Sequence, residues 1–286
     1  MSKILVTGAT GTFGAAVVDA LSDMSADFRV LVRDPARFKG KCEDIAVGDF
    51  ADQASLDSAL NGIERVFLAS FDRGDMPGLQ GNLLDAAKRQ GVRHVARIST
   101  MHVDNPNFAP IMADHARGEQ QLEDSGLAFT HLRPSWVLQN FFPTSSATPV
   151  RDGKIRLPAG DGPVSFVDAR DVATVAAVAL TEPGHEGVTY ELTGAEARTH
   201  RELAEVLSTT TGKEITFENL SLEHYLRELE DAGWPALSVQ SMEMLFSDMR
   251  EGGQGIVTDH VQRVTNRPPL SIEDFARDYV GRFTTA

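Results

Sequence analysis

Three glycines near the start of the chain have the spacing of a dinucleotide-binding loop. Gly8, Gly11 and Gly14 lie in the segment Thr-Gly-Ala-Thr-Gly-Thr-Phe-Gly at 7–14. The first glycine permits a tight turn, the second lets the backbone approach a pyrophosphate, and the third lets a helix pack close to a strand. The amide groups at the start of that helix then face the phosphates. The expected cofactor contacts in this loop are Gly8, Thr10, Gly11, Thr12, Phe13 and Gly14.

The residue after the second predicted strand bears on the choice between NAD and NADP. An Asp or Glu at this position hydrogen-bonds the ribose 2′-hydroxyl of NAD, whereas an arginine suits the 2′-phosphate of NADP. Arg33 occupies the position, which favours NADP. Asp34 is adjacent, and a shift of one residue would place a carboxylate there instead. NAD is therefore the less favoured alternative.

Later strand ends supply further expected cofactor contacts, because ligands of open parallel sheets bind at the carboxyl ends of the strands. Asp49 follows the third predicted strand, next to Phe50, and is placed to meet the adenine. The far side of the cofactor should meet the residues after the fourth, fifth and sixth strands. These residues are Ala69, Ser70, Phe71, Ser99, Thr100 and Pro134. Ser99 either orients a substrate oxygen or only caps the strand end.

Strand-like and helix-like segments alternate through the first half of the chain. This pattern predicts an α/β fold of the Rossmann type, with a doubly wound parallel sheet covered by helices on both faces. We assign residues 1–134 to this nucleotide-binding core. The predicted strands are 3–7, 28–32, 45–47, 65–69, 94–99 and 128–132, and the predicted helices are 11–22, 53–60, 78–90 and 113–125.

In the second half, residues 135–286, strand-like and helix-like segments no longer alternate regularly. Segment 135–168 contains several prolines and glycines and few periodic runs. Strand 188–192 is expected to rejoin the sheet, and the remainder to form a small α/β substrate lobe. The predicted helices here are 167–180, 200–211, 219–252 and 271–284.

Composition excludes several classes of function. The net charge of −14 among 286 residues argues against nucleic-acid binding, which needs a basic face. One cysteine, Cys42, allows neither an internal disulfide nor a cysteine-based metal site, and the eight histidines show no metal-binding spacing. No apolar run reaches the ~20 residues of a membrane span, and no signal peptide is visible. We expect a cytoplasmic protein without metal or membrane partners; a homodimer is compatible with this fold.

The motifs together resemble the NmrA-like family of atypical short-chain dehydrogenases/reductases, and within it the type 2 NADPH-quinone oxidoreductases. The resemblance covers nearly the whole chain. It rests on 8–14, Val32-Arg33-Asp34-Pro35, Gly48-Asp49-Phe50, Ile98-Ser99, and the stretch 115–140 with Glu119, Arg133-Pro134, Trp136 and Asn140. It implies an NADPH-dependent enzyme that reduces a quinone or a related aromatic small molecule.

The chain departs from the reductase pattern at its catalytic pair. Related reductases carry Tyr-x-x-x-Lys on the helix after the fifth strand, and aligning Glu119 puts Ile111 and His115 at those positions. A ketone that accepts hydride becomes an alkoxide and needs a positioned acid. A quinone becomes a hydroquinone anion that its own ring stabilises. A quinone therefore fits this chain better than a simple ketone.

His115 is the catalytic candidate, together with Ser99. The resemblance implies that His115 hydrogen-bonds the nicotinamide ribose or helps to protonate the product, as an imidazole with a pKa near ~6.5 can do. The alternative is a surface histidine without a ligand. Expected substrate contacts are Met101, Trp136 and Phe141. Trp136 and the pair Phe141-Phe142 either form an aromatic wall for a flat ring or belong to the core of the lobe, which is the commoner role of such pairs.

Two other functions remain open. Members of the NmrA-like family include redox sensors that bind the nucleotide and regulate a protein partner without turnover, and the missing Tyr/Lys pair is compatible with that. A tailoring reductase of an aromatic natural product is the third hypothesis.

Overall fold

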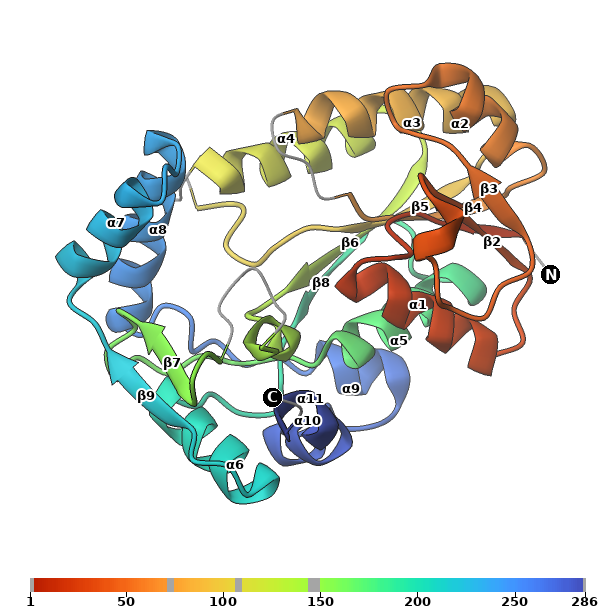
Figure 1. Cartoon of the computed structure of the whole chain (residues 1–286). Helices are drawn as coiled ribbons and strands as arrows, with labels where there is room; N and C mark the ends of the chain where they lie inside the picture. The colour runs from red at the N-terminus through yellow and green to blue at the C-terminus, as the bar shows by residue number, and fades with distance from the viewer. Residues whose placement is uncertain (1–2, 71–74, 106–109, 144–149, 285–286) are drawn as a thin grey trace. The chain divides into compact units, whose positions relative to one another are not determined.

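The computed structural model of the chain (Figure 1) describes residues 3–70, 75–105, 110–143 and 150–284. The chain forms two compact units, each assembled from segments that are distant in sequence. The first comprises Met1–Val103, Asp114–Arg133 and Ala169–Glu191, and the second comprises Asp104–Ala113, Pro134–Asp168 and Leu192–Ala286. The sequence analysis placed one boundary at 134/135, and that division stays a prediction.

A seven-stranded sheet has the order β3-β2-β1-β4-β5-β6-β8. The pairs from β3 to β6 are parallel, so the predicted doubly wound sheet is confirmed. The winding reverses at β1, which lies between β2 and β4, and a crevice for a ligand forms at such a reversal. The strands are β1 (Ile4–Val6), β2 (Phe28–Val32), β3 (Ile45–Val47), β4 (Arg65–Leu68), β5 (His94–Ile98), β6 (Ala128–Pro134) and β8 (Val188–Leu192).

Helices cover both faces of this sheet (Figure 1). On one face lie α2 (Gln53–Leu60), α3 (Met76–Gln90) and α4 (Pro110–Asp124), and on the other lie α1 (Thr12–Asp23) and α5 (Ala169–Thr181). Helix α1 buries Gly14, Val17, Val18 and Leu21, the spacing of a helix with one apolar face. Helix α3 ends at Gln90 and is followed by Gly91, whose φ of 77° gives a left-handed C-cap that suits glycine.

The second unit has a core of its own, built around a two-stranded parallel sheet of β7 (Lys154–Leu157) and β9 (Thr216–Asn219). The sequence analysis missed both strands. It also read 219–252 as one helical stretch, whereas the structure has two helices, separated at Gly233 with its φ of 78° and at Pro235. The helices are α6 (His200–Thr211), α7 (Leu222–Asp231), α8 (Ala236–Arg250), α9 (His260–Thr265), α10 (Ile272–Asp278) and α11 (Val280–Thr284).

No helix within the described ranges combines the length and the apolarity that a bilayer crossing requires.

Candidate functional site

The loop between β1 and α1 is folded as a phosphate-binding loop requires. Gly8 has a φ of +64°, and a Cβ there would lie 2.8 Å from the carbonyl oxygen of Ala69. A Cβ on Gly14 would collide with the carbonyl oxygen of Gly8. The first glycine therefore permits the turn, and the third lets α1 pack directly on the loop, as the sequence analysis expected.

The amino end of α1 is open to an anion. Gly11 is the N-cap and offers no side chain to the helix, and the first turn contains no acidic residue. Thr10, Gly11 and Thr12 are exposed, and Phe13 is half-buried. Because the first amides of a helix lack partners within it, the loop presents unpaired N–H groups and the positive end of the helix dipole. A dinucleotide pyrophosphate fits this arrangement.

Thr7 joins the glycine loop to the end of β4. Its buried hydroxyl donates to the carbonyl oxygen of Ala69 at 2.9 Å and accepts from the Ala69 N–H at 2.9 Å. Ser70 follows, half-buried, and its hydroxyl accepts from Gln80 Nε2 at 2.8 Å. The sequence analysis named Ala69 and Ser70 but not Thr7 or Gln80. Phe71 lies outside the described residues.

Arg33 and Asp34, both exposed after β2, have different roles. The Asp34 carboxylate accepts from the Ala36 N–H at 3.0 Å and caps the short helix Pro35–Arg37. Among residues that the structure describes, none forms an ion pair with Arg33. Arg33 is thus available for a 2′-phosphate, whereas the Asp34 carboxylate has a structural role. The contact itself stays a prediction.

Asp49 and Phe50 lie in the turn that leads from β3 into α2. The Asp49 carboxylate accepts from the Ala51 N–H at 2.9 Å, and its own N–H donates to Ser55 Oγ at 3.1 Å. Phe50 packs against the core of the first unit. Asp49 is half-buried and held in place, so an adenine contact would use a fixed group.

The residues after β5 include two buried side chains. The Ser99 N–H donates to the Leu132 carbonyl oxygen at 2.7 Å, which extends the pairing with β6. Ser99 Oγ has no described partner in good hydrogen-bond geometry, yet lies close enough to Glu119 to help lower the pKa of that carboxyl. Met101 is 3% exposed, while Thr100 is half-buried. Pro134, the last residue of β6, is buried.

A buried polar network lies beneath these strand ends, and the sequence analysis missed its central residue. Arg97 on β5 is fully buried and donates from Nε to Gln80 Oε1 at 2.8 Å. Glu119 accepts from Arg133 Nε at 3.0 Å and Nη2 at 2.6 Å. These hydrogen bonds hold the pKa of Glu119 below its usual value despite burial. The only sequence signal for Arg97 is a charged residue inside an otherwise apolar strand.

His115 is a neutral ring at pH 7. Burial, followed by the positive charge of Arg97, lowers the pKa of its imidazole to about 4. The sequence analysis assumed a pKa near ~6.5, and this assumption is wrong because the helix face of α4 that carries His115 is desolvated. His115 can act as a hydrogen-bond donor or acceptor, but a charged imidazolium is not the source of a proton here.

The two aromatic candidates belong to the second unit. Phe141 is fully buried in the core of that unit. Trp136 packs against the same core, with its ring centroid 6.1 Å from that of Phe246 and 6.3 Å from that of His200. Phe141 thus has the core role that the sequence left open, and a substrate contact by either residue stays a prediction.

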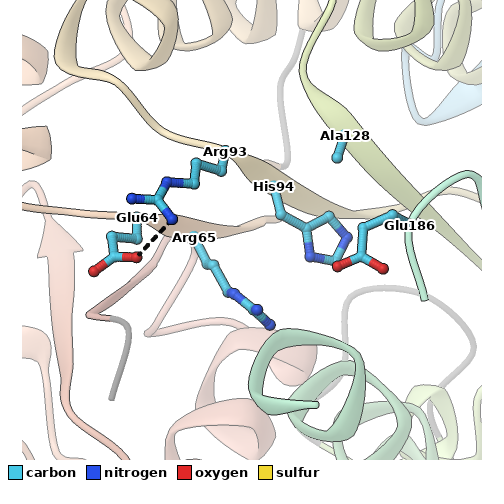
Figure 2. Close-up of a pocket in the computed structure, with 6 residues that line it drawn as sticks. All are labelled: Glu64, Arg65, Arg93, His94, Ala128 and Glu186. Atoms are coloured by element: carbon cyan, nitrogen blue, oxygen red, sulfur yellow. Dashed lines mark ion pairs between the residues drawn. The ribbon is translucent and has the colours of Figure 1, made fainter. Parts of the chain in front are cut away.

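A separate hollow of about 260 Å³ lies at the other edge of the sheet, where the strands begin (Figure 2). Arg65, His94 and Ala128 are the first residues of β4, β5 and β6, and Glu64 pairs with Arg93 at 3.8 Å. Glu186 completes the lining. Because nucleotides bind at the carboxyl ends of parallel strands, this hollow is not the candidate site.

Within the described part of the chain, one group of side chains has the spacing of metal ligands. It consists of Glu119, Glu123 and His131. Glu119 already accepts two hydrogen bonds from Arg133, whose positive charge opposes a cation. We therefore interpret the group as part of the polar network.

Comparison with known proteins agrees with this geometry. The chain is 33% identical to an NAD(P)H azoreductase of Xenophilus azovorans, over 99% of this chain and 100% of the relative. It is 34% identical to quinone oxidoreductase 2 of Escherichia coli, over 81% and 82% of the two chains. It is 35% identical to a (4-alkanoyl-5-oxo-2,5-dihydrofuran-3-yl)methyl phosphate reductase of Streptomyces griseus, over 98% and 99%.

Solved structures show the same fold. The Escherichia coli NADPH-dependent quinone oxidoreductase in complex with NADPH superposes with a TM-score of 0.81 at 28% identity, over 96% of this chain and 99% of the other. A family model matches residues 1–273. The glycine loop, the strand order and these matches together place the chain in the NmrA-like family.

Proposed function

We propose that this chain transfers hydride from NADPH to a quinone or to a related conjugated acceptor. The chain is an NAD(P)H-dependent oxidoreductase with NADP as its cofactor, in line with relatives named as azoreductase and quinone oxidoreductase and a structural neighbour solved with NADPH. What we propose beyond this is that the acceptor is a quinone or another conjugated molecule.

The observation that carries the acceptor class is the sequence of α4, which has Ile111 and His115 where related reductases have tyrosine and lysine. The ring of His115 is neutral, because burial and Arg97 lower its pKa to about 4. The three tyrosines of the chain, Tyr190, Tyr225 and Tyr279, lie on β8, on α7 and after α10. The helix that carries the acid in related reductases thus offers neither a tyrosine nor a charged histidine. An acceptor that stabilises its own negative charge needs no such acid.

The substrates named for the relatives also stabilise their own negative charge after hydride addition. An azo group, a quinone and an oxo-dihydrofuran are all conjugated, and hydride addition to each gives an anion that spreads over several atoms. The reaction balances as NADPH, acceptor and one proton giving NADP+ and the two-electron-reduced acceptor, with the proton taken from solvent. This shared chemistry supports a conjugated acceptor over a simple ketone.

The residues have separable proposed roles. The loop at Gly8, Gly11 and Gly14 holds the pyrophosphate, and Arg33 holds the 2′-phosphate. When bound, NADPH supplies the hydride. Ser99 and His115 orient the reacting groups through neutral hydrogen bonds. Trp136 is the proposed aromatic contact for the acceptor.

The test is NADPH oxidation by the purified protein against benzoquinones, naphthoquinones and azo dyes, with simple ketones as the control panel. We expect turnover with conjugated acceptors, a preference for NADPH over NADH, and no turnover with ketones. Ketone reduction without quinone reduction would contradict the acceptor class. Tight NADPH binding without turnover on any acceptor would favour a redox sensor with a protein partner. A cytoplasmic location and a homodimer stay predictions.

A further inference from the structure

Arg97 is a buried cation without a carboxylate of its own. Its side chain is fully buried, and among the residues that the structure describes it has one hydrogen-bond partner, the side-chain oxygen of Gln80, at 2.8 Å from Nε. Nη1 and Nη2 have no hydrogen-bond partner among the described residues. Glu119 does not fill this role, because Arg133 already donates to both of its oxygens. Leaving charged donors unpaired in the interior is costly, so such groups require an explanation.

The guanidinium lies against the face of α4 that carries His115. A Cβ on Gly118 would lie 2.8 Å from Arg97 Cζ and 2.9 Å from Gln80 Oε1, so only glycine leaves room for the arginine there. His115 precedes Gly118 by three residues and therefore lies on the same side of the helix. Nδ1 of His115 is also buried without a described partner.

The same side chain is connected to the end of β4. Gln80 accepts from Arg97 with its oxygen and donates with its nitrogen to Ser70 Oγ at 2.8 Å. Ser70 and His115 are both predicted cofactor contacts. Arg97 is thus connected through Gln80 to Ser70 and packs on Gly118 of the helix that carries His115, although no part of it reaches the surface.

The unpaired atoms have the donor and acceptor chemistry that one water molecule can satisfy. Arginine has donors only, whereas a neutral histidine has one donor and one acceptor. A water that accepts from Nη1 and Nη2 and donates to Nδ1 of His115 makes three hydrogen bonds, the usual number for a buried water. With Nδ1 accepting, the proton of the neutral ring must be on Nε2.

We propose that Arg97 is a positioning residue of the cofactor site, which holds a buried water against Nδ1 of His115 and so fixes the ring as a neutral Nε2–H donor. This inference rests on the proposed NADPH site. In that site the fixed N–H would face the nicotinamide ribose. Arg97 acts through His115 and the water and touches neither cofactor nor acceptor.

The surrounding charges agree with a neutral ring. The described charged groups that act on His115 are Arg97 from β5, and Glu119 and Asp114 from α4 itself. Asp114 is paired with Arg117, and Glu119 with Arg133 of β6. The two carboxylates are thus partly neutralised. Burial and the positive charge of Arg97 outweigh them, so the pKa of His115 is lowered.

The test is nitrogen-15 NMR of histidine-labelled protein between pH 5 and 8, with the His115 signal assigned by its loss in His115→Asn. In the wild-type chain we expect a single Nε2–H tautomer that does not titrate in this range. In Arg97→Met we expect both tautomers and a higher pKa of His115, because the charge that lowers the pKa next to burial is removed. Arg97→Lys, which keeps the charge, should keep the pKa of His115 closer to the wild-type value than Arg97→Met does. His224, exposed on α7, is the internal control and should be unchanged.

A second measurement follows NADPH affinity over the same pH range. In the wild-type chain His115 should contribute no change in the Kd for NADPH between pH 5 and 8. In Arg97→Met the Kd should change with pH around the new pKa of His115. A wild-type His115 that titrates near pH 6.5, or that carries its proton on Nδ1, would overturn the inference even if Arg97→Met does not fold. None of these experiments uses an acceptor, so a failure of quinone turnover would reject the proposed function and leave this inference standing.

Discussion

Thr7 and Ala69 are joined by reciprocal hydrogen bonds: Thr7 Oγ1 donates to the Ala69 carbonyl oxygen and accepts from the Ala69 N–H, both at 2.9 Å. The two residues follow β1 and β4, the neighbouring strands at which the winding of the sheet reverses. Gly8 lies so close to Ala69 that a Cβ would contact the same carbonyl oxygen. One buried hydroxyl therefore fixes the spacing of the two loops that form the crevice.

Removing this hydroxyl should weaken both folding and cofactor binding. Thr7→Val keeps the shape of the side chain but leaves the Ala69 N–H without its partner, and we expect a loss of roughly 1–3 kcal/mol in the free energy of unfolding. NADPH affinity should fall as well, because the glycine loop loses its anchor. Urea denaturation and NADPH titration measure the two effects. Thr7→Ser keeps the hydroxyl and is the matched control; a loss in Thr7→Ser as large as or larger than that in Thr7→Val would contradict the role given to the hydroxyl.

Local sequence patterns were sufficient to predict the sheet and the glycine loop. The three glycines and the apolar runs around them specify turn, strand and helix within a few residues of one another, and the strand order of such a fold follows from short connections. The short strands β7 and β9 escaped prediction because each has four residues and its partner lies far away in sequence. Their pairing depends on tertiary contacts, which no local pattern contains.

The sequence was sufficient to predict the candidate residues at strand ends and motif positions, but not the buried polar network around Arg97. Arg33 and His115 could be named because they follow a strand or occupy a motif position. The burial of Arg97 depends on Gln80 from α3 and on the missing side chain of Gly118 from α4. The pKa of His115 depends in turn on Arg97. These relationships arise only when distant segments pack together.

Gly14→Ala should damage the site much more than an alanine elsewhere in a helix. The added Cβ meets the backbone of Gly8, which cannot move without opening the loop, and overpacking of this kind costs about 1–3 kcal/mol. We expect lower thermal stability and a loss of NADPH binding. Gly81→Ala on α3 is the control, because a Cβ there meets nothing within 4 Å. That change should be neutral or stabilise the protein by about 0.5–1 kcal/mol, and a comparable loss in both variants would reject the tight-packing role of Gly14.

Arg33→Glu should reverse or abolish the preference for NADPH over NADH. The change removes a cation that has no ion-pair partner in the described structure and places a carboxylate where the 2′-phosphate is expected. Loss of one charge-assisted hydrogen bond, about 1.5–3 kcal/mol, corresponds to roughly tenfold or more in relative affinity. Separate titrations with NADPH and NADH give the ratio.

The control for this prediction is Arg93→Glu, which makes the same charge change at the opposite edge of the sheet, where Arg93 pairs with Glu64. It should leave the NADPH/NADH ratio unchanged. If Arg33→Glu also leaves the ratio unchanged, the 2′-phosphate is bound elsewhere.

Buried histidines should make the protein less stable in mild acid. His200 is fully buried among Trp136, Phe141, Phe166 and Phe217, and burial lowers its pKa to about 3. An unfolded chain binds a proton on this ring near pH 6.5, and the folded chain does not. The stability due to the neutral ring is therefore complete above pH 6.5 and is lost as the pH falls from 6.5 towards the folded value.

We expect the free energy of unfolding of the second unit to fall by up to roughly 1.4 kcal/mol per pH unit for this one histidine between pH 6 and 4. His200→Phe keeps an aromatic ring that cannot be protonated, so its unfolding free energy should fall less steeply over the same range. Both tryptophans, Trp136 and Trp234, lie in the second unit, so tryptophan fluorescence in urea titrations reports on its unfolding. His224→Phe, at an exposed position on α7, is the control and should keep the wild-type slope. Equal slopes for His200→Phe and the wild type would show that His200 takes up no proton on unfolding, contrary to the buried neutral ring.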